Sequence, residues 1–407
     1  MFFALRGENT DGNKYASSAI QNEARYAVID DPKFQEDERF LLVPDVLKTL
    51  QNLASFHRNQ FSIPVIGITG SNGKTTTKEL MHAVLSAAYR CHYTKGNYNN
   101  HIGVPLTLLA MKEDIEVAVI EMGANHPGEI AQLCEICRPT HGLITNVGKA
   151  HLEGFGSFEG VKKTKAELYD FLNGNSGLAF INRDEPYLWD LAADLRGRRI
   201  SYGSKEKGEE ENWLRGDCSQ APSGFLEIKF WDELENEAVA KSLLTGTYNC
   251  PNLISAISIG LYFKVPSGKI VEGLANYLPS DNRSQILEKD GVTYIMDAYN
   301  ANPTSIRAAL ESLDERKETH KFAILGAMKE LGEYAEQEHL EVLRYASSIG
   351  LEKIFAVGEE YRIPAEELDI QWFHNIDSLK QLEVSFPKGA VVLLKGSRSE
   401  KLESLLS

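Results

Sequence analysis

The sequence contains few cysteines, no long apolar run and too little positive charge for a general nucleic-acid binder. Its 407 residues include five cysteines, 43 Lys and Arg against 58 Asp and Glu, and a formal net charge of -15. Because nucleic-acid binding relies on excess basic residues that displace counterions, that class is excluded. Small anionic ligands would have to be held by local groups instead.

The sparse cysteines argue against a disulfide framework and predict reduced thiols. Cys134 and Cys137 form a CxxC pattern within a run of helical apolar spacing. No second Cys or His pair follows at a metal-site interval, so a plain helix face is favoured over a redox or zinc site.

No apolar run approaches the roughly 18 residues of a spanning helix, and residues 1–6 lack the zones of a signal peptide. We therefore expect a cytoplasmic protein without membrane insertion. The composition, 43% hydrophobic and 25% charged, is that of a globular protein. At roughly 150 residues per domain, the length predicts two or three domains.

Short β-branched runs alternate with helical stretches, which predicts an α/β fold around mostly parallel sheets. Most of these runs end in Gly, Asp, Glu or Asn, where such sheets bind ligands. The predicted strands are 26–29, 65–68, 117–120, 142–145, 294–296, 322–325, 354–357 and 391–394.

Two junctions divide the chain. A helix over about 44–58 gives way to a buried strand near Pro64, and turn residues at 278–282 precede a new set of strands. We expect an N-terminal piece at 1–61, a central domain at 62–279 and a C-terminal domain at 280–407. Within the central domain, 204–241 reads as a charged loop followed by antiparallel strands.

A glycine turn between a predicted strand and a helix is typical of a phosphate-binding loop. Its glycines let backbone N–H groups surround phosphate oxygens, Lys74 reaches the terminal phosphates, and Thr75 can bind Mg²⁺. Ile68 stands where the longer form of the motif has its first glycine, and the alternative is a chance glycine turn. The loop comprises Gly70, Ser71, Asn72, Gly73, Lys74, Thr75 and Thr76.

Three further residues suggest a metal site. Glu121 directly follows a buried strand, where an acid can hold Mg²⁺ or cap a turn. His151 follows another strand, although spacing alone favours a structural role for it. Lys165 shares a helical stripe with Val161 and Leu168, so it faces the core. A buried ammonium is costly, so Lys165 must snorkel, pair with an acid or be modified, for example as a carbamate that binds a second Mg²⁺.

Several motifs together resemble the Mur ligase family, the ATP-dependent enzymes that build the peptidoglycan stem peptide. They are Phe3-Ala-Leu-Arg-Gly7, Thr10-Asp-Gly12, Gly70-Ser-Asn-Gly-Lys-Thr75, Asn97-Tyr-Asn-Asn-His-Ile-Gly-Val-Pro-Leu106, Glu121-Met-Gly-Ala-Asn-His126, Ala150-His-Leu-Glu-Gly-Phe-Gly156, Asp297-Ala-Tyr-Asn-Ala-Asn302 and Lys395-Gly-Ser-Arg398. The resemblance implies a small N-terminal α/β piece that binds a UDP substrate, a central P-loop domain that binds ATP, and a Rossmann-like C-terminal domain that closes on ATP and binds the amino substrate.

The resemblance also implies residue roles. Lys74, Glu121, His151 and Lys165 would be catalytic, and Thr75, Glu121, His151 and the CO2-derived carbamate of Lys165 would hold two Mg²⁺ ions. Beside the loop 70–76, ATP would be bound by Asn249, Asn252, Arg283 and Asp297. The alternatives are helix capping for the two asparagines and surface ion pairs for Arg283 and Asp297.

The implied reaction is formation of an amide bond between UDP-N-acetylmuramoyl-tripeptide and D-alanyl-D-alanine through an acyl phosphate, a cytoplasmic step of peptidoglycan precursor synthesis catalysed by a monomer. Absence of an Asp-Asn-Pro-Arg element favours this dipeptide-adding type. The rivals are another Mur-type or folate-glutamate ligase, and an ATP-binding regulatory protein that has lost its chemistry.

Two departures from the family pattern bear on these expectations. The family usually carries some tens of residues before the position of Phe2, including a segment that binds uridine, so we expect an incomplete N-terminal domain and weakened affinity for the nucleotide sugar. Ala327 replaces the usual Asp, which argues against a functional role at that position.

Overall fold

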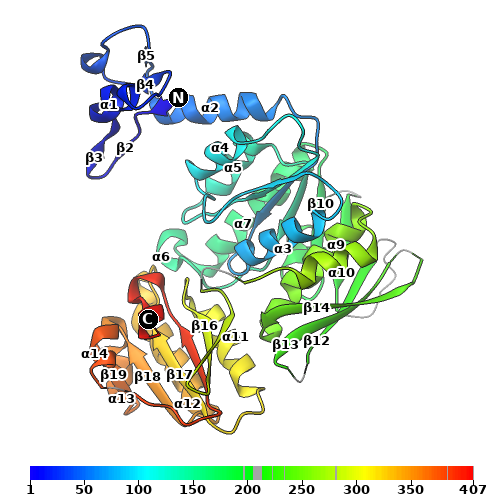
Figure 1. Ribbon diagram of the computed structural model, residues 1–407, viewed down its shortest axis with the longest axis vertical. Coiled ribbons are helices and arrows are strands. Elements are labelled where there is room, and N and C mark those ends of the chain that lie inside the picture. Colours follow the sequence, from blue (N-terminus) through cyan, green and yellow to red (C-terminus); the bar gives the residue numbers. More distant parts are fainter. Residues whose placement is uncertain are drawn as a thin grey trace.

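The computed structural model describes residues 1–195, 198–204, 213–221, 223–232, 234–279, 282–382 and 384–406. It has the predicted α/β architecture with mostly parallel sheets. In Figure 1 the N-terminal elements lie at one end, the largest sheet in the middle and the C-terminal sheet at the other end. Part of the predicted charged loop, at 205–212, and part of the predicted junction, at 280 and 281, lie outside the described residues. No helix in the described ranges is long and apolar enough to cross a membrane.

The N-terminal unit, β1 to α2, is built on a small parallel sheet in the order β1-β4-β5. Its last helix begins after Asp45, whose side chain accepts a hydrogen bond from the backbone of Lys48, a standard N-cap. Arg58 near the end of that helix donates to the carbonyls of Cys137 and Arg138, which ties the unit to its neighbour. The elements are β1 Phe2–Phe3, β2 Arg6–Gly7, β3 Thr10–Asp11, α1 Ala16–Gln21, β4 Ala27–Ile29, β5 Phe40–Leu42 and α2 Val46–Arg58.

The central unit, β6 to α10, is built on a sheet of order β14-β13-β12-β11-β10-β9-β6-β8-β7 among the described residues. The strand β6 is buried along its whole length between two parallel neighbours, which explains its continuous apolar sequence. The antiparallel extension β12–β14 follows the charged segment, as predicted. The strands are β6 Val65–Thr69, β7 Cys91–Tyr93, β8 Val117–Glu121, β9 His141–Ile144, β10 Leu178–Asn182, β11 Arg199–Gly203, β12 Trp213–Gln220, β13 Phe225–Trp231 and β14 Glu237–Thr245.

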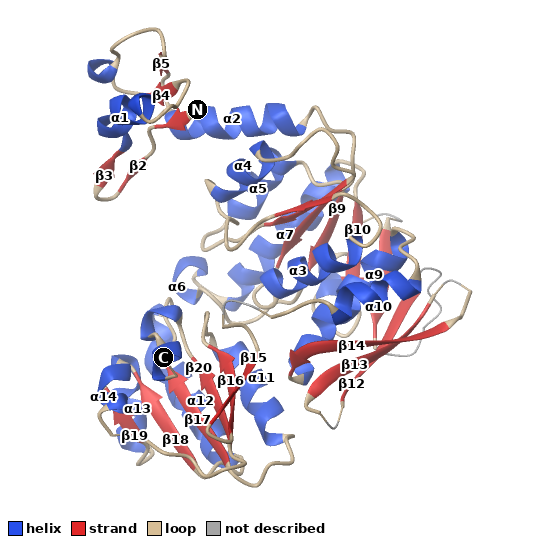
Figure 2. Ribbon diagram, viewed as in Figure 1, coloured by secondary structure: helices blue, strands red, loops and turns tan. Residues whose placement is uncertain are grey.

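Helices cover both faces of this sheet (Figure 2). One apolar cluster joins Leu80 and Val84 to Leu253 and Ile270, so α3, α9 and α10 share a face. A second cluster joins the buried sides of α5 and α7 on the opposite face. The helices are α3 Lys74–Leu85, α4 Gly103–Leu109, α5 Glu129–Cys137, α6 Leu152–Phe155, α7 Phe158–Gly174, α8 Leu188–Leu191, α9 Cys250–Tyr262 and α10 Ser267–Ala275.

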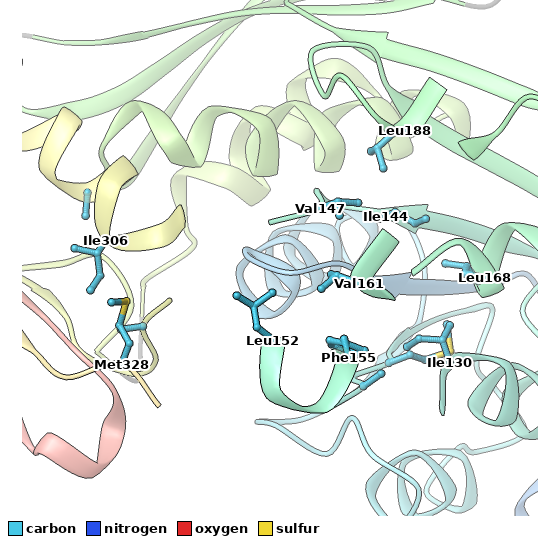
Figure 3. Close-up of a cluster of buried hydrophobic side chains, with 14 of the residues drawn as sticks. Ile130, Ile144, Val147, Leu152, Phe155, Val161, Leu168, Leu188, Ile306 and Met328 are labelled. Atoms are coloured by element: carbon cyan, nitrogen blue, oxygen red, sulfur yellow. The ribbon is translucent and has the colours of Figure 1, made fainter. Parts of the chain in front are cut away.

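The C-terminal unit, from β15 onward, has a sheet of order β15-β16-β20-β17-β18-β19, parallel except for β15. A hydrophobic cluster includes Leu152 and Phe155 of the central unit together with Ile306 and Met328 of this one (Figure 3). The elements are β15 Gln285–Lys289, β16 Val292–Asp297, α11 Pro303–Asp314, β17 Lys321–Gly326, α12 Ala335–Ser348, β18 Lys353–Val357, α13 Arg362–Glu367, β19 Gln371–Phe373, α14 Ile376–Lys380 and β20 Val391–Lys395.

The cysteines require one correction. The expectation of reduced thiols is wrong for Cys218 and Cys250, which form a disulfide. The strand β12, between β11 and β13, passes beside the start of α9, which brings the two Cα atoms to 5.7 Å, a proximity that a cysteine count does not reveal. Cys134 and Cys137 are free, buried on α5 and in contact with the Met122 sulfur, so the plain helix face is confirmed.

Candidate active site

A cavity of about 710 Å³ lies between the central and C-terminal units, at the carboxyl ends of their parallel strands. Such ends are where open α/β sheets bind ligands. Of the predicted site residues, Gly70 and Lys165 are not part of its lining. The others all line the cavity, namely Ser71, Asn72, Gly73, Lys74, Thr75, Thr76, Glu121, His151, Asn249, Asn252, Arg283 and Asp297.

The phosphate loop connects β6 to α3 and is held rigidly. Gly73 has a left-handed φ of 77°, and a Cβ there would lie 2.4 Å from Oδ1 of Asn252, so only glycine fits. The backbone N–H groups of Ser71 and Asn72 donate to the carbonyl and side-chain oxygens of Asn146. The loop therefore has a fixed shape in front of a helix N-terminus, as an anion site requires.

Lys74 is the first residue of α3 and folds back over the loop. Its ammonium donates to the carbonyls of Gly70 and Ser71 at 2.7 and 3.3 Å. Burial lowers the pKa of Lys74, while the negative charge of Glu121 acts in the opposite direction. A partly buried cation whose hydrogen bonds in the described residues go to neutral carbonyls is well suited to a polyanionic partner.

Glu121 is fully buried at the end of β8, beside the loop. Its Oε1 accepts hydrogen bonds from the Thr75 hydroxyl at 3.1 Å and from Asn99 at 2.7 Å. Among the described residues, Oε2 has no hydrogen-bond partner, although the Lys78 ammonium lies 3.5 Å away. The site predictions omitted Asn99 and Lys78; Asn99 does lie within the motif 97–106.

The Thr75 and Glu121 oxygens fit a magnesium ion. Mg²⁺ takes hard oxygen ligands and few protein groups, and Oε2 is a buried acceptor with an unused lone pair. No cluster of three or more His, Cys, Asp or Glu side chains that could hold a metal occurs in the described part of the chain. Any site here therefore depends on these oxygens and on groups brought by a ligand.

His151 lines the cavity after β9, the neighbour of the loop's own strand, at the N-cap of α6 with a left-handed φ of 52°. Its Nδ1 contacts the carboxylate of Glu330, which comes from the C-terminal unit. The backbone N–H of Glu153 also donates to the Glu330 carbonyl at 3.2 Å. The structure thus places the predicted metal ligand His151 in a contact between units, which the sequence did not indicate.

Lys165 is buried on α7, 2% exposed, in the stripe that the sequence predicted. Its ammonium lies 5.2 Å from the centre of the Phe155 ring, and no carboxylate of the described residues is within ion-pair distance. Burial lowers the pKa of Lys165 well below its ordinary value, and the charge of Lys74 lowers it further. Of the alternatives for this side chain, pairing with an acid is not observed.

Asn249 and Asn252 lie at the start of α9 but do not cap it. Asn252 accepts from the Thr77 hydroxyl and donates to Asn249 at 2.9 Å. Asn249 donates to the Thr245 carbonyl and to the Ser284 hydroxyl, and no side-chain cap bond forms at this helix. The capping alternative is therefore wrong, and the pair links α3 to the segment that enters the C-terminal unit.

The wall opposite the loop carries Arg283, in the segment just before β15, and Asp297 at the end of β16. The Arg283 guanidinium stacks 3.6 Å from the centre of the Tyr299 ring, and its buried Nε has no hydrogen-bond partner among the described residues. Asp297 pairs with the buried Lys395 at 2.7 Å, a partner that the site predictions omitted. Asn302 reaches across the cavity and donates to the Asn72 side chain at 2.7 Å.

Ala327 is fully buried at the end of β17, and its carbonyl accepts from the backbone N–H of Ser397. A methyl side chain at this position has no polar group to offer the cavity.

Known proteins resemble this chain along its whole length. Residues 68–260 match the Mur ligase middle domain, and residues 282–398 match the Mur ligase, glutamate ligase domain. The chain is 36% identical over 420 residues to the UDP-N-acetylmuramoyl-tripeptide--D-alanyl-D-alanine ligase of Bacillus subtilis, covering 100% of this chain and 89% of the relative. The Escherichia coli ligase of the same name is 31% identical over 412 residues, with 100% and 90% covered.

Solved structures give the same result. A crystal structure of MurF from Acinetobacter baumannii superposes with a TM-score of 0.87 at 29% identity, covering 99% of this chain and 88% of that one. The MurF ligase of Thermotoga maritima in complex with ADP gives a TM-score of 0.84 at 28% identity, with 99% and 92% covered. The chain therefore belongs to the Mur ligase family.

Proposed function

We propose that the chain is an ATP-dependent ligase that joins D-alanyl-D-alanine to UDP-N-acetylmuramoyl-tripeptide in the cytoplasm, as a step of peptidoglycan precursor synthesis. The observation that carries this proposal is a single cavity in which the phosphate loop and Glu121 face Arg283 and Asp297. Relatives named for this reaction match the chain along its full length, which supports the same substrates here.

In this proposal each wall has its own task. The loop 70–76 with Lys74 would bind the ATP phosphates, and Thr75 and Glu121 would hold one Mg²⁺, whose positive charge would favour transfer of the phosphoryl group. Asn249 and Asn252 bind the nucleotide from the central unit. Arg283 and Asp297 bind it from the C-terminal unit and contact the phosphates and the ribose, respectively.

The bond changes follow from the substrates. A carboxylate oxygen of the tripeptide attacks the γ-phosphorus of ATP, the bond from that phosphorus to the β–γ bridging oxygen breaks, and ADP leaves. The dipeptide amine then attacks the acyl carbon, and phosphate and a proton are released. Lys74 and Arg283 stabilise the charge that develops on the phosphoryl oxygens, so no covalent protein intermediate is needed.

A second Mg²⁺ site is proposed at His151 and a carbamylated Lys165. Carbamate formation requires a neutral amine, and burial favours the neutral form of Lys165. The modification would replace an unpaired buried ammonium by an anionic oxygen ligand. His151 would first have to exchange its contact with Glu330 for the metal.

The domain division is also a proposal, with a UDP-substrate domain at 1–61, an ATP-binding domain at 62–279 and a closing domain at 280–407 in a monomer. Separate sheets for the three units support it. Several contacts between the last two units are polar pairs, such as Lys149 with Glu338, that can re-form in another arrangement. We therefore expect the C-terminal domain to move during the cycle.

The test is release of phosphate from ATP and Mg²⁺, with UDP-N-acetylmuramoyl-tripeptide and D-alanyl-D-alanine supplied separately and together. The proposal expects release only when both are present, with a product heavier than the tripeptide substrate by the dipeptide less water. The Lys74→Ala variant serves as the negative control, because it lacks the lysine proposed to bind the ATP phosphates. Release with a folate and glutamate, and not with the proposed pair, would contradict the substrates but not the ligase chemistry.

A further inference from the structure

Lys78 is a buried charge that the proposed reaction does not use. Its side chain is 0% exposed, and it lies on α3 one turn after Thr75, so the two side chains share one face of the helix. Its ammonium donates to the Gly96 carbonyl at 3.0 Å and lies 5.7 Å from the centre of the Tyr93 ring. A lysine in such a place is stable only when its charge is compensated.

The compensation comes mainly from Glu121. The Lys78 ammonium lies 3.5 Å from Oε2 of Glu121 and 3.7 Å from Oε1 of Glu79. Glu79 is partly exposed and is also bonded by the Tyr277 hydroxyl, whereas the Glu121 side chain is 1% exposed. The ammonium and the Glu121 carboxylate therefore form a buried pair of opposite charge.

The two carboxylate oxygens of Glu121 have different neighbours. Thr75 and Asn99 donate to Oε1, and the backbone N–H of Glu121 is held by the Thr94 hydroxyl at 3.0 Å. Oε2 is too far from Lys78 for a strong hydrogen bond and has no other partner in the described ranges. The hydrogen bonds to Oε1 therefore orient the carboxylate. The Lys78 ammonium balances its charge near Oε2, and Oε2 keeps a free lone pair.

We propose that Lys78 is a positioning residue that holds the Glu121 carboxylate oriented toward the Mg²⁺ of the nucleotide site. This inference rests on the proposed role of Glu121 as a metal ligand. Groups that orient a metal ligand without contacting the metal set its affinity, and their loss costs about 10- to 100-fold. Helix α3 would then supply both the Thr75 ligand and, one turn later, the group that fixes its carboxylate partner.

The charge of Lys78 makes the test decisive. Coulomb repulsion alone predicts that removing this cation strengthens Mg²⁺ binding, because a like charge leaves the site. Loss of positioning predicts the opposite. The sign of the change in Mg²⁺ affinity therefore separates the two effects.

The experiment is calorimetric titration of Mg²⁺ into the full-length protein saturated with ADP. For Lys78→Met the apparent Mg²⁺ dissociation constant should rise about 10- to 100-fold. Lys78→Arg, which keeps the charge, should show a smaller rise. Glu79→Gln, which removes the other acid near Lys78, should stay within about twofold of the parent, and Lys78→Met should add nothing to a Glu121→Gln background.

The outcomes distinguish a failure of the positioning role of Lys78 from a failure of the proposed metal site at Glu121. Unchanged Mg²⁺ affinity in Glu121→Gln would contradict the proposed metal site itself. Weakened binding in Glu121→Gln with unchanged or tighter binding in Lys78→Met would overturn only the positioning role. If Lys78→Met does not fold, Lys78→Gln, which also lacks the charge, takes its place, and unchanged or tighter Mg²⁺ binding in that variant would equally overturn the inference.

Discussion

The functional groups of the central wall and Arg283 on the opposite wall are held in different ways. On the central wall the loop, Glu121 and Asn252 are each fixed by hydrogen bonds within their own unit, among them the bonds with Asn146, Asn99 and Thr77, respectively. On the C-terminal wall Arg283 rests on an aromatic ring with its Nε unpaired among the described residues. Contacts such as Asn302 with Asn72 connect that wall to the other unit.

If the C-terminal unit moves as proposed, this difference separates a preorganised part of the site from a part whose position depends on that movement. Groups fixed before binding cost no reorganisation when charge develops on the phosphates. Groups carried by a second unit act only after that unit has closed. Substitutions on the central wall should therefore lower both nucleotide affinity and kcat, whereas substitutions on the C-terminal wall should mainly lower kcat.

The largest effect is expected for Lys165→Ala. Loss of the proposed carbamate ligand should lower kcat by at least about 100- to 1,000-fold, the cost of removing one charge-stabilising group. Steady-state phosphate release measures this. Lys163→Ala is the matched control, because Lys163 is exposed on the same helix and should leave kcat unchanged.

The proposed carbamate on Lys165 can be detected directly, without measuring activity. Protein equilibrated with ¹³C-bicarbonate should give a carbamate carbon signal by NMR that is missing in Lys165→Ala. Full activity in the alanine variant would rule out the modified lysine as part of the mechanism.

A smaller and more selective effect is expected for Arg283→Ala. Because this guanidinium stacks on Tyr299 on the C-terminal wall, its loss should lower kcat about 100-fold and weaken ADP binding by less than about tenfold. Calorimetry with ADP and steady-state kinetics measure the two quantities. Arg307→Ala, at an exposed arginine of α11 paired with Glu311, is the control.

An equally large loss of ADP affinity in Arg283→Ala would show that Arg283 already belongs to the preorganised part of the site. The contrast between the two walls would then be wrong at this residue.

The smallest expected effect is a pH dependence of the free energy of unfolding, which arises from a residue of the central wall. Burial raises the pKa of Glu185, which lines the cavity, to about 7, and the charge of Asp184 adds to this. The folded state therefore retains a proton that the unfolded state loses above about 4.5, so this residue's contribution to stability decreases as pH rises from about 4.5 to 7. Urea unfolding across this range should show a weaker decrease in Glu185→Gln than in the parent. The same decrease in both proteins would contradict the assignment.

The sequence predicted local elements well and long-range neighbours poorly. The strands β6, β8, β17 and β20 lie where the β-branched runs predicted them, because a buried parallel strand is apolar along its length. The loop 70–76 and the acid at the end of β8 follow from the same local pattern.

Partnerships between distant residues had no local signal. His151 with Glu330, Asp297 with Lys395 and Cys218 with Cys250 each depend on which elements the fold brings together. Lys78 could be placed on the same helical face as Thr75 from the sequence, but its closeness to Glu121 depends on how α3 packs beside β8.

The central claim is that this cavity activates a carboxylate by transferring phosphate to it. The most direct measurement uses UDP-N-acetylmuramoyl-tripeptide labelled with ¹⁸O in its terminal carboxylate, together with ATP, Mg²⁺ and D-alanyl-D-alanine, and determines the mass of the released phosphate. An acyl phosphate leaves one carboxylate oxygen on that phosphate, so the account predicts one ¹⁸O per phosphate and a dipeptide-extended product. Product formation with unlabelled phosphate would contradict it.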